Sequence, residues 1–146
     1  LDNDISQYED ISKLCIENTR CLLVELSPLG YNPRYTEWIY SLTMKGYLPI
    51  IAHIERYPYI QELFRDLDGV DVVYQMNAKA ILKRKWRSFL VSNYEINERK
   101  IVVASDMHNL SLRKCLLGKA REKMEKNHSA IAQEVFYEMP KKILGI

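Results

Sequence analysis

The stretch IVVASDMH, Ile101 to His108, is an apolar, β-branched run that ends at an aspartate and a histidine. The run Ile101 to Ser105 lacks the polar alternation of a strand with one wet face, so it is typical of a strand buried on both faces of a parallel sheet. Three runs of the same kind precede it: CLLVEL (Cys21 to Leu26), LPIIAH (Leu48 to His53) and VDVVYQM (Val70 to Met76). The sequence therefore predicts four strands of one parallel sheet.

Helical patterns separate these runs. The segment from Pro33 to Lys45 opens with a proline suited to a first helical turn and closes before Gly46. Apolar residues at three- and four-residue spacing predict three more helices: Tyr59 to Leu67, Ala80 to Val91 and Leu110 to Lys126. A last helix is expected over His128 to Glu138, stopped near Pro140 because proline lacks a donor and clashes with the preceding turn. The alternation predicts an α/β fold, either an open doubly wound sheet or part of a closed (β/α) barrel.

The composition is that of an ordinary globular domain. The 146 residues are 47% hydrophobic and 27% charged, and no linker divides them, so we expect a single domain over residues 1–146. A net charge of +2 is too mild to indicate a nucleic-acid partner. No run approaches the roughly 18 apolar residues of a membrane span, and the acidic start is unlike a signal peptide. The three cysteines lack zinc-type spacing, which favours reduced thiols and a cytoplasmic protein.

Polar side chains stand at the end of every predicted strand. In both candidate architectures the carboxyl ends of parallel strands meet at one edge, where functional groups gather. The groups that the four strands bring there are Glu25, then His53 with Glu55 and Arg56, then Gln75 and Asn77, and last Asp106, His108 and Arg113.

Carboxylates and imidazoles together are ligands suited to Mn²⁺, Fe²⁺, Zn²⁺ or Mg²⁺, and a carboxylate such as Glu25 can bridge two ions. Asp106 and His108 are two apart, so in an extended chain their side chains point the same way. Such a cluster would generate hydroxide near neutral pH and polarise a phosphoryl oxygen. The alternative is that these are hydrogen-bonded structural residues, because strand ends in any such fold are rich in polar groups.

Four blocks of the sequence carry a family resemblance, in the expected order and at the expected separations. They are VELSP (Val24 to Pro28), GYLPIIAHIERY (Gly46 to Tyr57), VYQMNAKAIL (Val73 to Leu82) and VVASDMHNLSLR (Val102 to Arg113). They resemble the second half of bacterial protein-tyrosine phosphatases of the PHP type, the polymerase and histidinol phosphatase superfamily.

The resemblance implies a distorted (β/α)₇ barrel, of which this chain would cover roughly the C-terminal four β/α units. It also implies a cluster of divalent metal ions, usually manganese, and hydrolysis of phosphotyrosine by a metal-activated hydroxide in capsule or exopolysaccharide regulation. The implied partner is a phosphotyrosine protein, the tyrosine-rich tail of a bacterial autokinase.

Site residues follow from the resemblance position by position. Glu25 matches the family's bridging carboxylate, His53 a histidine ligand, and Asp106 and His108 the last two metal ligands. Arg56 and Arg113 match the phosphate-binding arginines, a role that suits a planar guanidinium able to grip two phosphate oxygens. The alternative for these arginines is a salt bridge to Glu55 or to a loop carboxylate.

The sequence also departs from the family pattern. The family begins with an HxH block on its first strand, whereas the only histidines here are His53, His108 and His128, so we expect the N-terminal portion of the barrel to be absent. Two alternatives therefore stay open beside the tyrosine phosphatase. One is a PHP-type phosphoesterase for a small ester such as histidinol phosphate, since the ligands do not set specificity. The other is a non-catalytic half-barrel whose unpaired strand edges another copy would cover, which makes a homo-oligomer plausible.

The segment Cys115 to Arg121 (CLLGKAR) formally matches the Cys-x₅-Arg pattern of cysteine-dependent tyrosine phosphatases. We reject this reading because the pattern needs a phosphate-cradling loop at a helix start, whereas the leucines here are spaced for a helix already under way. Cys115 is accordingly expected to be a small buried residue. Tyr57, Tyr59 and Tyr74 near the strand ends are expected to pack, although they could flank a substrate ring.

Overall fold

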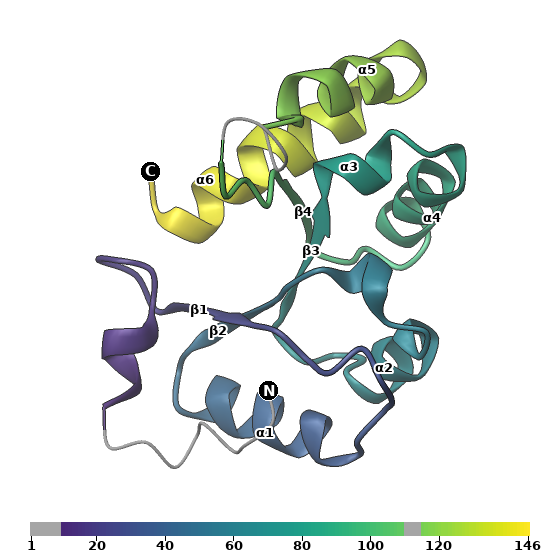
Figure 1. The fold of residues 1–146 in the computed structure, drawn as a ribbon. Helices are drawn as coiled ribbons and strands as arrows, with labels where there is room; N and C mark the ends of the chain where they lie inside the picture. The colour runs from purple at the N-terminus through teal and green to yellow at the C-terminus, as the bar shows by residue number, and fades with distance from the viewer. Residues whose placement is uncertain (1–9, 110–114) are drawn as a thin grey trace. The chain divides into compact units, whose positions relative to one another are not determined.

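A computed structural model describes residues 10–109 and 115–146 of the chain (Figure 1). The residues fall into two compact units, one ending at Tyr74 and the other covering Gln75–Ile146. The prediction of a single domain over residues 1–146 stays a prediction.

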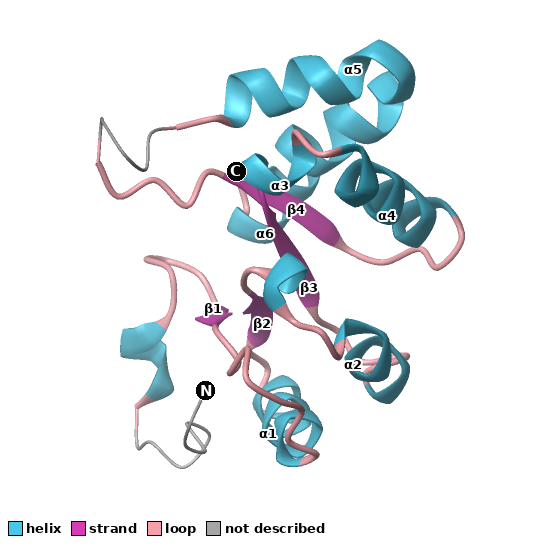
Figure 2. Ribbon diagram, turned by 45° about the vertical axis from the view of Figure 1, so that its right-hand side comes forward, coloured by secondary structure: helices cyan, strands magenta, loops and turns pink. Residues whose placement is uncertain are grey.

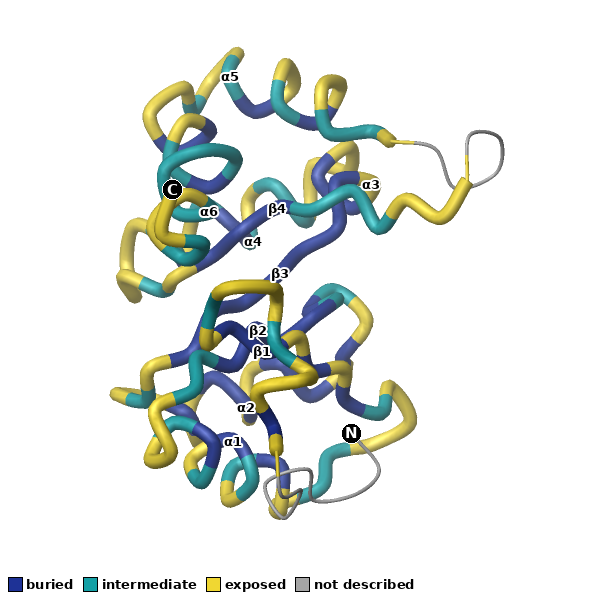
Figure 3. The backbone as a smooth tube through the Cα atoms, turned by 90° about the vertical axis from the view of Figure 1, so that its left-hand side faces the viewer, coloured by how far each residue is buried: buried dark blue, intermediate teal, exposed yellow. Residues whose placement is uncertain are grey.

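The four predicted strands are confirmed as one four-stranded sheet in the order β1-β2-β3-β4, with β1, β2 and β3 parallel neighbours. Their bounds are β1 Cys21–Val24, β2 Leu48–Ile51, β3 Val73–Asn77 and β4 Ile101–Ala104. All five residues of β3 are buried, as the lack of polar alternation predicted (Figure 3). On β1 the exception is Leu23, whose exposed fraction is 60%. The α/β class with a parallel sheet is therefore correct.

In the first unit, helix α1 (Arg34–Met44) packs against β2, and helix α2 (Ile60–Asp66) precedes β3 (Figure 2). Ile39 and Leu42 of α1 have no exposed surface. Two short 3₁₀ turns complete the unit, η2 (Ile11–Leu14) before β1 and η3 (Ile54–Arg56) after β2. Both long helices lie within one or two residues of their predicted bounds.

Helix α1 ends at a glycine, as predicted, and the capping geometry explains why. The amide of Gly46 donates to the Thr43 carbonyl (2.8 Å) and that of Tyr47 to the Leu42 carbonyl (3.1 Å), which is the paired bonding of a Schellman motif. Gly46 has φ +78°, a conformation that side chains other than glycine adopt only with strain.

The side chain of Arg20 supports this helix end from outside. Its Nε donates to the Gly46 carbonyl (2.7 Å) and its Nη2 to the Lys45 carbonyl (2.6 Å), and the guanidinium stacks over the Tyr47 ring at 4.7 Å. Arg20 directly precedes β1, and the Leu48 amide that opens β2 donates to the Arg20 carbonyl (2.9 Å). One residue therefore caps the helix and starts the parallel pairing of β1 and β2.

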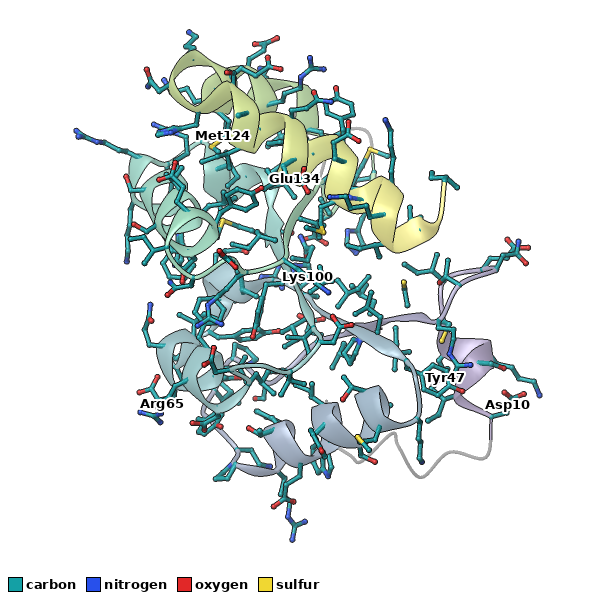
Figure 4. The ribbon with its side chains drawn as sticks, turned by 180° about the vertical axis from the view of Figure 1, so that it is seen from behind. Asp10, Tyr47, Arg65, Lys100, Met124 and Glu134 are labelled. Carbon is teal, nitrogen blue, oxygen red and sulfur yellow. The ribbon has the colours of Figure 1, made fainter. Side chains whose placement is uncertain are left out.

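The second unit contains helix α3 (Ala78–Ile81), α4 (Arg84–Glu95), α5 (Leu117–Gln133), the π-helical segment η4 (Glu134–Glu138) and α6 (Met139–Leu144). The segments η4 and α6 pack against β4, while α5 packs against α3 and α4. Met124 of α5, labelled in Figure 4, is fully buried in this unit.

Three predicted helix bounds in this unit are wrong. The helix expected over Ala80 to Val91 is two helices that break at Leu82 and Lys83, because Arg87 turns back to donate to the Ile81 and Leu82 carbonyls (2.8 and 2.9 Å). The helix expected from Leu110 begins at Leu117, and residues 110–114 lie outside the described part of the chain.

The helix expected to stop near Pro140 instead continues to Leu144 and ends at Gly145 in a left-handed conformation. Pro140 lies at the start of α6, directly after the π-helical turn, and the first turn of a helix tolerates proline. The prediction treated Pro140 as the interior of a regular α-helix, which it is not.

Within the described residues, no helix combines the length and the apolar character needed to cross a lipid bilayer.

Substituting Gly46 tests the helix end. An added Cβ would lie 3.3 Å from Nη2 of Arg20 and would force the new residue to hold φ +78°, so Gly46→Ala is expected to lower the free energy of unfolding by about 1–2 kcal/mol. Urea denaturation measures this loss. The matched control is Gly30→Ala, whose Cβ meets nothing within 4 Å and which is expected to change stability by less than about 0.5 kcal/mol. Equal effects of the two variants would contradict the capping role.

Candidate metal centre

The carboxyl ends of β1 and β2 bring Glu25 and His53 together. The strands pair in register, with Val24 opposite Ile51, and the Ala52 amide extends the pairing by donating to the Val24 carbonyl (2.9 Å). Glu25 directly follows Val24 and His53 directly follows Ala52, and Nε2 of His53 lies 4.0 Å from Oε1 of Glu25. The His53 side chain is only 14% exposed, whereas that of Glu25 is 58% exposed. An exposed carboxylate and a largely covered imidazole thus meet where the pairing of β1 and β2 ends.

Arg56 joins this pair from the turn η3. Its Nη1 donates to Oε1 of Glu25 at 3.3 Å, and its amide donates to the His53 carbonyl at 2.8 Å. Because both side chains are more than a third exposed, this salt bridge adds little stability and its importance is geometric. Of the two predicted interpretations of Arg56, the salt bridge is present, and its partner is the predicted bridging carboxylate.

Asp106 and His108 form a second pair in the second unit, directly after β4. The Nδ1 atom of His108 lies 3.5 Å from Oδ1 of Asp106 and 3.0 Å from its backbone oxygen. The Asp106 side chain is 15% exposed and that of His108 is 56% exposed. The two side chains are therefore close together, although Asp106 has φ 52° and the chain is not extended there as the sequence analysis assumed. Arg113, the other predicted phosphate-binding residue, lies outside the described residues.

Left-handed backbone marks both pairs. Four described residues other than glycine have positive φ, and two of them are the predicted ligands His53 (φ 57°) and Asp106 (φ 52°). Such a conformation costs about 1–2 kcal/mol per residue and is enriched at active sites. At these two positions the chain turns sharply as it leaves a strand, which directs the side chains to the edge of the sheet.

The donors suit a divalent metal ion in their chemistry and spacing. Two ligands that share an ion at about 2.0–2.2 Å each lie no more than about 4.4 Å apart, and both the Glu25–His53 separation of 4.0 Å and the Asp106–His108 separation of 3.5 Å fall within this limit. Among residues 10–109 and 115–146, no group of three or more His, Cys, Asp or Glu side chains is assembled for an ion. The described structure therefore provides two ligand pairs, one in each unit.

The third strand contributes amides where the sequence analysis placed them. Gln75 and Asn77 are both buried, and Nε2 of Gln75 donates to Oδ1 of Asn77 at 3.1 Å. Buried amides must be hydrogen-bonded to be tolerated, so this pair partly satisfies itself.

Cys115 differs from its prediction. It is exposed and lies before the first residue of α5, whereas a buried position on a helix was expected. The helix begins later than the leucine spacing indicated, at Leu117, and Leu116 and Leu117 are only half buried. Arg121 is nonetheless engaged elsewhere, since its Nε donates to Oε1 of Glu125 at 2.6 Å and its Nη1 donates to the Tyr137 hydroxyl. These bonds, not burial of the cysteine, are the structural argument against a Cys-x₅-Arg phosphate loop.

Tyr57 and Tyr59 are buried near the first ligand pair, and they pack as the sequence analysis expected. Their rings stack at 5.4 Å with an interplanar angle of 14°, and the Tyr59 hydroxyl donates to the Ser27 carbonyl. Burial raises the pKa of Tyr57 to about 12, and burial together with the neighbouring tyrosines raises the pKa of Tyr59 as well. Nothing in the local sequence indicates that these tyrosine hydroxyls bond to the backbone, so only the fold reveals those contacts.

Comparisons with known proteins identify the family. The family model for capsular polysaccharide synthesis, CpsB/CapC, matches residues 2–145, and the chain belongs to this family. The resemblance stated from the sequence is thereby confirmed.

Its relatives include two named tyrosine-protein phosphatases. CpsB of Streptococcus pneumoniae is 29% identical over 88% of this chain and 58% of its own length, and YwqE of Bacillus subtilis is 31% identical over 72% of this chain and 44% of its own. A chain from the crystal structures of YwqE and CpsB, described as unique metal-dependent tyrosine phosphatases, superimposes with a TM-score of 0.79 over 99% of this chain and 61% of that chain, at 24% identity. That likeness establishes a shared fold. The chain spans about half the length of the curated relatives it matches.

The raised pKa of Tyr57 predicts a pH dependence of stability. Because the folded-state pKa of about 12 lies above the ordinary value of 10.0, the contribution of Tyr57 is fully present below pH 10 and is lost as the pH rises through 12. The difference in unfolding free energy between the wild type and Tyr57→Phe is therefore expected to shrink by about 2 kcal/mol between pH 9 and pH 12. Guanidinium denaturation across this range measures it, and a constant difference would contradict the buried, neutral phenol.

Proposed function

We propose that this chain is part of a metal-dependent protein-tyrosine phosphatase, a phosphoric monoester hydrolase that acts in capsule or exopolysaccharide regulation. The observation that carries the proposal is the meeting of Glu25, His53 and Arg56 at the paired ends of β1 and β2. A carboxylate and an imidazole can hold a metal ion that activates water, and a nearby guanidinium can bind the phosphate. Hydrolysis of a phosphate ester needs both functions. Membership of the CpsB/CapC family and the names of the relatives support the same reaction.

The metal ligands in this proposal are Glu25, His53, Asp106 and His108. Glu25 has two carboxylate oxygens and would bridge, while each histidine offers one ring nitrogen. Mn²⁺ is the proposed ion, with Mg²⁺, Fe²⁺ and Zn²⁺ compatible with the same donors. When bound, such ions supply a nucleophile at neutral pH and polarise the phosphoryl group.

Arg56 and Arg113 would bind the phosphate of the substrate. Nη1 of Arg56 donates to Oε1 of Glu25 at 3.3 Å, an exposed contact that keeps the guanidinium at the strand ends, and a guanidinium in this place can donate to phosphate oxygens. A guanidinium in this position offsets the negative charge that develops on the equatorial oxygens in the transition state. Arg113 has the same proposed role, which is to bind phosphate oxygens.

The proposed architecture is a distorted (β/α)₇ barrel of the PHP type, to which this chain contributes about four β/α units. The strand order and the shared fold with the YwqE and CpsB structures support it. The proposed substrate is a phosphotyrosine protein, specifically the tyrosine-rich tail of a bacterial autokinase, and the proposed location is the cytoplasm. The apolar Leu23 on β1, 60% exposed, supports a homo-oligomer or a further protein segment against that strand.

Substitution of Asp106 tests the enzyme. Asparagine tolerates the left-handed backbone at this position but is a neutral and weaker ligand, so Asp106→Asn is expected to reduce both bound metal and p-nitrophenyl phosphate turnover on the order of 100-fold. Elemental analysis of the purified protein and a phosphatase assay with and without a chelator measure the two effects. The matched control is Asp68→Asn, an exposed carboxylate before β3, which is expected to leave both unchanged.

The other outcomes point to the alternatives. Turnover that survives chelation but is abolished by thiol alkylation would contradict the metal mechanism and implicate Cys115. Chelator-sensitive turnover of histidinol phosphate but not of phosphotyrosine peptides would keep the reaction and change the substrate. The absence of both bound metal and turnover would favour a non-catalytic half-barrel.

A further inference from the structure

A single buried hydroxyl connects the two strand ends that carry Glu25 and His53. The Leu26 amide donates to the Tyr57 hydroxyl oxygen at 3.0 Å, and the same hydroxyl donates to the Ala52 carbonyl at 2.6 Å. Leu26 directly follows Glu25, and Ala52 directly precedes His53. The hydroxyl therefore bonds to the backbone immediately beside each proposed ligand.

This bridge continues the sheet beyond its last regular bond. The pairing of β1 and β2 ends with the Ala52 amide donating to the Val24 carbonyl at 2.9 Å. Beyond that point the backbone at His53 turns into the left-handed region, so no further strand pairing can form there. The Tyr57 hydroxyl links the two backbones at the point where the regular pairing of β1 and β2 ends.

The local chain explains how Tyr57 reaches this place. After the left-handed turn at His53, the single 3₁₀ turn η3 reverses the chain, and the Tyr57 amide closes it by donating to the Ile54 carbonyl at 3.3 Å. The Tyr57 ring, only 2% exposed, then lies under the strand ends, stacked on Tyr59. Its ring packs, while its hydroxyl makes both of the directed contacts.

We propose that Tyr57 is a positioning residue, which sets the separation and direction of Glu25 and His53 by bridging Leu26 and Ala52. This inference rests on the proposed function, because it assigns the bridge a purpose at the ligand pair of the metal centre. Groups one step removed from a metal commonly tune its affinity by 10–100-fold through orientation of the ligands, and a buried bridge between two ligand-bearing backbones acts in the same way. Tyr57 touches neither substrate nor metal in this role.

The variant Tyr57→Phe separates the hydroxyl from the ring. It keeps the stacking on Tyr59 and removes both bonds, so amide exchange of Leu26 is expected to accelerate at least about tenfold relative to the rest of β1. Nuclear Overhauser contacts between the His53 ring and the Glu25 side chain are expected to disappear. The dissociation constant for Co²⁺, followed by its d–d absorption, is expected to rise about tenfold with an altered band shape.

The control is Tyr35→Phe, which removes a hydroxyl from a buried ring of the same aromatic cluster, 6.4 Å from Tyr59 between centroids. Because the Leu26 and Ala52 bonds belong to Tyr57, this variant is expected to leave the exchange, the contacts and the Co²⁺ spectrum unchanged. A general loss of packing would alter both variants alike, whereas a positioning role alters only Tyr57→Phe.

The outcomes separate this inference from the function on which it rests. A folded Tyr57→Phe protein with unchanged His53–Glu25 contacts and unchanged Co²⁺ binding overturns the positioning role, whatever its thermal stability. A wild-type chain that binds no Co²⁺ contradicts the metal centre in this chain, and the bridge is then judged by the contacts and the Leu26 exchange alone. If Tyr57→Phe does not fold, p-aminophenylalanine at position 57 keeps a donor for the Ala52 carbonyl. Because an aniline nitrogen is a poor acceptor for the Leu26 amide, this variant breaks one side of the bridge, so the His53–Glu25 contacts are expected to weaken; contacts that stay at full strength overturn the proposal.

Discussion

The parallel pairing of β1 with β2 is the constraint on which the candidate centre depends. Its register places Val24 opposite Ile51, so Glu25 follows the pair directly and His53 follows one residue later, where its left-handed backbone leaves Nε2 4.0 Å from Oε1 of Glu25. Arg20 starts this pairing by binding the end of α1 and accepting the first bond of β2, and Tyr57 closes it by bridging Leu26 and Ala52.

The backbone is strained after β2 and β4, at His53 and Asp106. His53 and Asp106 both hold a left-handed backbone that costs free energy; His53 follows the buried Ala52, and Asp106 follows β4 by two residues. In the first unit, which contains His53, the rings of Tyr57, Tyr59 and Tyr35 pack with centroids 5.4–6.4 Å apart. The exposed Glu25–Arg56 bridge adds little stability by comparison.

Much of the fold could be predicted from local patterns. Continuous apolar β-branched runs identified all four strands, and Gly46 identified the end of α1. The failures came where a distant or irregular contact outweighs the pattern. Arg87 caps the end of α3 and splits one predicted helix, and a π-helical turn carries the chain past Pro140. Neither is visible in residue spacing, because both depend on which backbone carbonyls are left to bond.

The candidate site, like the fold, could be predicted only in part from the sequence. The sequence alone determined which side chains are chemically able to bind a metal and a phosphate, since ligand type and position after a strand are local properties, and it determined the family through four ordered blocks. Tertiary structure decided that His53 lies 4.0 Å from Glu25, that Arg56 pairs with that same carboxylate, and that Tyr57 bridges the two strand ends. These are contacts across about 30 residues of chain, and a hydroxyl acquires such a role only when folding brings two backbones to it.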